Sequence, residues 1–60
     1  MDPNAALENM RRAVANYRAG EDADMSAAEL VDYARDMAEL FAGLDEWVTG
    51  GGFLPAAWSR

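Results

Sequence analysis

Apolar residues recur at spacings of three and four over residues 30–48, and this periodicity constrains the fold more than any other feature of the sequence. They are Leu30, Ala34, Met37, Phe41, Leu44 and Val48, flanked at intervals of seven by Tyr33, Leu40 and Trp47. Such spacings place side chains on one face of an α-helix. Ser26 and Glu29 form the capping box that marks a helix N-terminus. The sequence therefore predicts a helix over about 27–49.

Residues 3–19 carry a second helical pattern. Asp2 is suited to cap a helix that begins at Pro3, and Gly20 is predicted to end it. Between them lies one apolar seam of Leu7, Met10, Val14 and Tyr17. Because the connector over 20–25 is short, the two helices should pack antiparallel. We expect a single all-α domain over 1–60, an antiparallel two-helix hairpin with a hydrophobic C-terminal tail.

The predicted helices differ in length, which gives the tail a role. At about 1.5 Å per residue, the first helix is ~25 Å long and the second ~34 Å. The end of the second helix, with Trp47, should therefore extend past the first and need a cover. Gly50 is the expected left-handed residue after that helix. The tail over 50–60 contains Phe53, Leu54 and Trp58, and should fold back on this end or dock on another chain.

The apolar stripe over 30–48 is wider than the contact between two helices requires. A 60-residue chain also builds only a marginal core, and this one has no cysteine or histidine for a disulfide or a structural zinc site. Self-association is the remaining device, so we expect a homodimer with a four-helix arrangement. The residues predicted to contact the partner or the second copy are Tyr33, Leu40, Trp47, Phe53, Leu54 and Trp58.

The chain is acidic, with a net charge of -6. Direct binding to nucleic acid or to an anionic membrane is therefore not expected, since both require a basic surface. The N-terminal residues lack the pattern of a secretory signal, and no apolar run reaches the ~20 residues of a membrane span. We expect a cytoplasmic protein, in the host cytoplasm if it is phage-encoded.

No residue set points to catalysis, a cofactor or a metal. Asp22, Asp24 and Ser26 resemble the start of a calcium loop, but Ala27 and Tyr33 stand where such a loop needs glycine and glutamate. The serines and threonine have no histidine or lysine to activate them. The carboxylates over 32–46 fall opposite the apolar stripe, and one of them, Asp32 or Glu39, is expected to pair with Arg35. We expect a non-enzyme with no cofactor and no metal.

One segment carries a resemblance to known proteins. It reads Leu44-Asp45-Glu46-Trp47, then Gly51-Gly52-Phe53-Leu54-Pro55, and finally Trp58. This pattern resembles the C-terminal end of short uncharacterised helical proteins of actinobacteriophages, of the mycobacteriophage type. The resemblance covers about a third of the chain and implies a small phage accessory protein that binds a phage or host protein.

Two alternatives to this function remain open from the sequence. The first is an acidic mimic of nucleic acid that blocks a DNA-handling protein, suggested by nine acidic residues against two arginines over 20–60. The second is an assembly factor of the virion.

Overall fold

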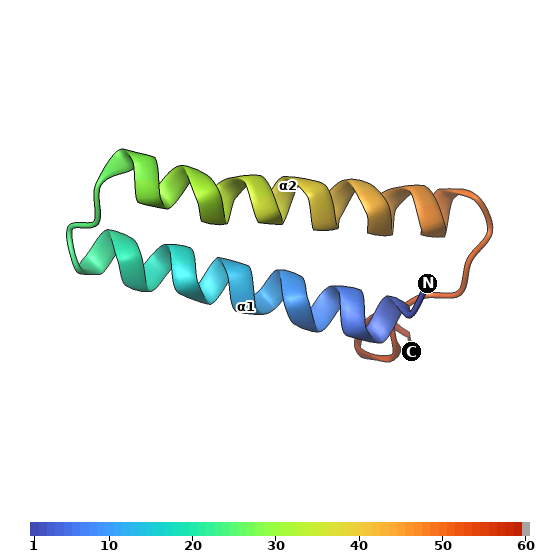
Figure 1. Ribbon diagram of the computed structural model, residues 1–60. Coiled ribbons are helices and arrows are strands. Elements are labelled where there is room, and N and C mark those ends of the chain that lie inside the picture. The colour runs from blue at the N-terminus through green and yellow to red at the C-terminus, as the bar shows by residue number, and fades with distance from the viewer. Residues whose placement is uncertain (60) are drawn as a thin grey trace.

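The computed structural model describes residues 1–59, which form a hairpin of two long helices (Figure 1). Helix α1 spans Pro3–Asp22, helix α2 spans Ala27–Thr49, and a short 3-10 turn, η1, spans Ala56–Trp58. The two long helices lie antiparallel and pack against each other along their length. The predicted all-α helical hairpin is confirmed.

Helix α1 begins as predicted but ends later. The Asp2 carboxylate accepts hydrogen bonds from the backbone N–H groups of Asn4 at 3.0 Å and Ala5 at 3.3 Å, and Pro3 occupies the first helical position. Gly20 was expected to end the helix, but it is buried inside the last turns, which continue to Asp22. A Cβ at Gly20 would lie 2.7 Å from Met25 Sδ and 2.9 Å from Leu30 Cδ2. Glycine at position 20 therefore lets Met25 and Leu30 pack closely against α1 at the turn between the helices.

The turn that ends α1 uses Asp24 in place of glycine. Asp24 has a φ of 59°, in the left-handed region, where aspartate is tolerated better than most residues. Its N–H donates to the Glu21 carbonyl at 3.1 Å, and the Met25 N–H donates to the Gly20 carbonyl at 2.9 Å. These two bonds form a Schellman motif and satisfy the last carbonyls of α1. The helix therefore stops without a glycine at its left-handed position.

Helix α2 ends in a second Schellman motif. At its start, Ser26 Oγ accepts a hydrogen bond from the Glu29 N–H at 3.3 Å. At its end, the left-handed residue is Gly51, with a φ of 97°, and not Gly50 as predicted. The Gly51 N–H donates to the Val48 carbonyl at 3.1 Å and the Gly52 N–H to the Trp47 carbonyl at 2.8 Å. The expected position was wrong by one residue, because Gly50 itself keeps near-helical angles as the C-cap.

The two helices are closer in length than predicted. They contain 20 and 23 residues, so the difference is about 4.5 Å rather than ~9 Å. The tail leaves α2, crosses the open end of the hairpin and finishes beside the first turns of α1 (Figure 1). Pro55 of the tail and Pro3 of α1 are both fully buried. The tail thus covers the open end within its own chain.

The core is small. Among the described residues, the buried apolar side chains apart from the prolines are Ala6, Leu7, Ala13 and Leu44. Phe41, on the predicted apolar stripe, is 60% exposed, and Ala34 is exposed as well. A single neighbouring helix covers only the middle of the wide stripe on α2. These two residues lie on the part of the stripe that α1 leaves uncovered.

Candidate functional site

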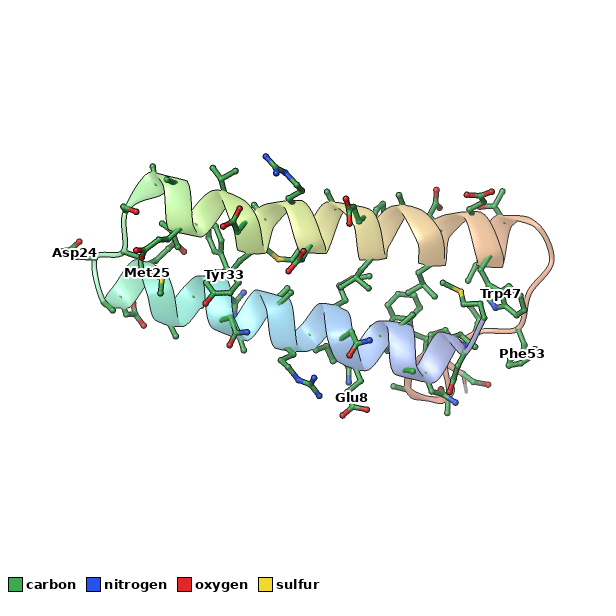
Figure 2. All side chains as sticks on the ribbon, in the orientation of Figure 1. Glu8, Asp24, Met25, Tyr33, Trp47 and Phe53 are labelled. Atoms are coloured by element: carbon green, nitrogen blue, oxygen red, sulfur yellow. The ribbon has the colours of Figure 1, made fainter. Side chains whose placement is uncertain are left out.

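The tail is attached to α2 through Trp47. The Trp47 Nε1–H donates to the Phe53 carbonyl at 3.0 Å, and the two rings meet edge to face, 5.7 Å apart at an angle of 85°. Gly52 lies against the indole so closely that a Cβ there would be 2.5 Å from Trp47 Cδ2. Figure 2 shows both side chains at the open end of the hairpin. The first two tail residues after the turn are therefore held in one place.

A second anchor joins the tail to α1. The Ala56 N–H donates to Asn4 Oδ1 at 2.6 Å, across 52 positions of the sequence. This bond satisfies the start of η1, whose Trp58 N–H then donates to the Pro55 carbonyl at 2.9 Å. Sequence reasoning missed Asn4, because a polar residue in the first turn of a helix carries no signal for a partner so far along the chain.

After this docking, large apolar side chains of the tail still face solvent. Phe53 is 69% exposed, and Leu54 and Trp58 are each 44% exposed. Trp58 lines a pocket on α2 together with Phe41, Leu44, Asp45 and Val48. Phe53, by contrast, lies with Trp47. The structure therefore separates the predicted tail contacts into two places.

Tyr33 and Leu40, also predicted as contact residues, lie elsewhere. Both are half-buried and line a groove between α1 and α2. Figure 2 labels Tyr33 between the two helices. The rest of that groove is mainly polar, with Asn9, Arg12, Ala13, Asn16, Asp36 and Glu39. Trp47 lines a separate groove near Met1 and the glycines at the end of α2. The six predicted residues do not form one continuous patch.

The opposite side of the hairpin holds apolar residues that sequence reasoning did not list as contacts. Val31 is 48% exposed and lines a groove with Tyr17, Leu30 and Ala34. Phe41 is exposed farther along the same helix, ten residues on. The signal was present in the sequence, because residues 27, 31, 34, 38, 41 and 48 are apolar and share one helical register, which Asp45 interrupts. It was overlooked because the apolar stripe over residues 30–48, which lies beside it on the helix, is a stronger pattern.

The charged groups are dispersed. Every aspartate and glutamate in the described chain is exposed, and the ion pair found among residues 1–59 joins Glu8 and Arg12 at 3.5 Å. The predicted pairing of Arg35 with Asp32 or Glu39 is absent from this part of the chain. Asp22 lies in the last turn of α1 and Asp24 in the turn that follows. The structure assembles no candidate acid–base pair from these residues.

Among residues 1–59, no group of three or more potential ligand residues is placed to hold a metal ion. Neither long helix combines the length and apolarity that crossing a membrane requires. Comparisons with protein-family models, curated proteins and solved structures found no match to this chain.

Proposed function

We propose that this protein is non-enzymatic and acts by binding another protein through the apolar side chains that the hairpin leaves exposed. The observation that carries the proposal is Phe53, which is 69% exposed although its backbone is held by Trp47. An exposed aromatic ring on an ordered backbone loses little conformational entropy on binding. Such residues dominate the energy of protein interfaces.

The tail is built to present this ring rather than to bury it. Pro55 is buried and Ala56 bonds to Asn4, so the segment that follows Phe53 is anchored to α1. The Trp47 indole meets the Phe53 ring in an edge-to-face arrangement, and the Phe53 side chain stays 69% exposed to solvent. The backbone of the tail therefore holds the tail to the hairpin, and the Phe53 side chain stays free to contact a partner.

The proposed partner is a phage or host protein, and the protein is proposed to be a phage accessory protein. Support for this class of partner comes from the resemblance of residues 44–58 to actinobacteriophage proteins. The test is capture of proteins from an actinobacterial lysate on immobilised wild type, Phe53→Ser and Val31→Ser proteins. We expect Phe53→Ser to lose the captured protein and Val31→Ser, on the other side of the hairpin, to keep it. Equal capture by all three would refute the role of Phe53.

A second candidate function rests on the exposed acidic residues. All eleven carboxylates lie at the surface, so the protein could occupy a basic site on a DNA-handling protein. Such binding should weaken steeply as salt is raised, whereas binding through Phe53 should change little. A salt titration of the captured complex separates the two. A role in virion assembly would instead be supported by finding the protein in purified particles.

A further inference from the structure

One pocket on the described surface combines apolar walls with a carboxylate. It lies where the tail meets α2 and is lined by Phe41, Leu44, Asp45, Val48 and Trp58. Leu44 is fully buried, whereas Phe41 and Trp58 keep much of their surface exposed. Asp45 is the polar member of this set. The pocket thus offers two aromatic rings and one negative charge to a group that enters it.

The size of the pocket suits one side chain. Its volume is about 120 Å³, which is the space of about four water molecules at roughly 30 Å³ each. Pockets that hold drug-sized ligands measure about 300 to 1,000 Å³. The pocket is also more enclosed than the three grooves described above. A single side chain from another protein therefore fits it better than a free ligand does.

The Asp45 carboxylate is available to such a side chain. Asp45 is exposed, and the Thr49 hydroxyl donates one long hydrogen bond of 3.5 Å to its Oδ1. An ionised carboxylate accepts about four hydrogen bonds, so this contact uses little of its capacity. The ion pair found among residues 1–59 joins Glu8 and Arg12, and none of the described arginines pairs with Asp45.

The Trp58 ring comes from an anchored segment. The Trp58 N–H donates to the Pro55 carbonyl at 2.9 Å, and Pro55 itself is fully buried. The Ala56 N–H, between them in sequence, donates to Asn4 of α1. A partner therefore meets this wall of the pocket already ordered and loses little entropy in ordering it.

We infer that this pocket accepts an arginine side chain of the partner protein. The inference rests on the proposed function, the binding of another protein, and adds the chemistry of one partner residue at a place separate from Phe53. The methylene stem of arginine packs on the apolar walls, and its planar guanidinium stacks on an aromatic ring while it donates to the Asp45 carboxylate.

The charge of the pocket selects this occupant over an apolar one. An apolar side chain would shield the Asp45 carboxylate from water without giving it a hydrogen-bond donor, which is unfavourable. A guanidinium satisfies the carboxylate and is less strongly hydrated than the ammonium of lysine. The net charge of -6 on the chain also favours the approach of a basic partner surface.

The test needs no identified partner. The probe is an Ala-Arg-Ala tripeptide with both ends blocked, titrated into the full chain while NMR follows the indole N–H signals of Trp58 and Trp47. The matched peptide carries citrulline, which has nearly the shape of arginine without the charge. We expect the arginine peptide to shift the Trp58 signal and not the Trp47 signal. The citrulline peptide should bind about tenfold more weakly, because it lacks the charge-assisted hydrogen bond.

Two carboxylate variants locate the charge that matters. Asp45→Asn and Glu46→Gln each remove one negative charge from adjacent exposed positions of α2, but Glu46 lines the groove of Trp47 instead of this pocket. Both changes keep the shape of the side chain, so the helix should be retained. Asp45→Asn should weaken binding of the arginine peptide about tenfold, whereas Glu46→Gln should change it less than about twofold.

Arg60 lies outside the described residues but only two positions past Trp58, so an Arg60→Gln variant tests whether the chain's own arginine competes. Its binding of the arginine peptide should equal that of the wild type or be tighter. Weaker binding would contradict an electrostatic site.

Several results would overturn the inference. One is an unchanged Trp58 signal at about 20 mM arginine peptide, well above the millimolar range of weak binding. Others are equal binding of the citrulline peptide, equal or tighter binding of a lysine peptide, and equal weakening by both carboxylate variants. Phe53→Ser should bind the arginine peptide as the wild type does. Failure of partner capture through Phe53 is therefore read separately from failure of this pocket.

Discussion

Replacing Gly52 with alanine should detach the tail from Trp47. A Cβ at this position would lie 2.5 Å from Trp47 Cδ2 and closer still to Cε2 and Nε1. Real Cβ atoms do not approach aromatic atoms so closely, so the indole must move. The indole is a rigid ring that makes two contacts, the edge-to-face pair with the Phe53 ring and the hydrogen bond to the Phe53 carbonyl. A small rotation of the ring cannot keep both.

The expected loss of stability can be worked out from the two contacts that Trp47 makes with Phe53. Loss of the hydrogen bond from the Trp47 Nε1–H to the Phe53 carbonyl lowers the stability of the fold by about 1 kcal/mol net. Losing the edge-to-face pair costs about 0.5 to 1.5 kcal/mol more. The free energy of unfolding should therefore fall by roughly 2 kcal/mol. For a chain of this size, whose core supplies no more than about 3 to 5 kcal/mol, that is a large fraction.

Gly51→Ala is the matched control. Gly51 has a φ of 97°, and a Cβ there meets no atom within 4 Å. This substitution should cost about 1 kcal/mol through backbone strain, and the indole should stay in place. The two variants thus separate strain in the turn from contact with Trp47.

The measurement is urea unfolding followed by tryptophan fluorescence at one fixed protein concentration, since association shifts apparent stability. The indole N–H signals of Trp47 and Trp58 in NMR spectra report the tail directly. In a Trp47→Leu background the extra cost of Gly52→Ala should disappear, as a double-mutant cycle requires. If Gly52→Ala is no worse than Gly51→Ala and the Trp47 N–H signal is unchanged, the reasoning is refuted.

Substitutions at three further positions test other parts of the fold by the same unfolding assay. Asp24→Gly should stabilise the protein by about 0.5 to 1 kcal/mol because it relieves a left-handed aspartate, whereas Asp24→Ala should not stabilise it. Gly43→Ala should stabilise by about 1 kcal/mol, since its Cβ would meet only Met1 Cε at 3.6 Å; destabilisation would mean that another backbone packs there. Asn4→Ala should cost about 1 kcal/mol by removing the acceptor for the Ala56 N–H, and unchanged protection of that N–H in hydrogen exchange would contradict this.

The hairpin itself could be read from local patterns. The Asp2 cap with Pro3 and the Ser26 cap are signals carried within a few residues, and the structure has both. The end of α1 was harder to predict, because Gly20 resembles a helix stop. Its burial against Met25 and Leu30 depends on how the chain packs after the turn. Local sequence does not contain that information.

In the tail, too, some features could be predicted from local sequence and others depend on tertiary packing. The glycines over 50–52 and the apolar residues after them predicted a segment that turns and needs cover, from backbone freedom and the hydrophobic effect alone. Its attachment to Asn4, and the separation of Phe53 from Trp58, were not predictable. Both depend on contacts between residues far apart in sequence, which form only when two helices of particular lengths lie side by side.

The sequence by itself determined that this chain forms two amphipathic helices, because periodicity and capping act within one or two turns. It also determined that α2 has more apolar surface than one neighbour covers. Only the tertiary structure decided which flank of α2 stays open, since helix α1 can cover only the middle of the stripe. Val31 and Phe41 therefore lie exposed beside the core, while Tyr33 and Leu40 lie in a polar groove.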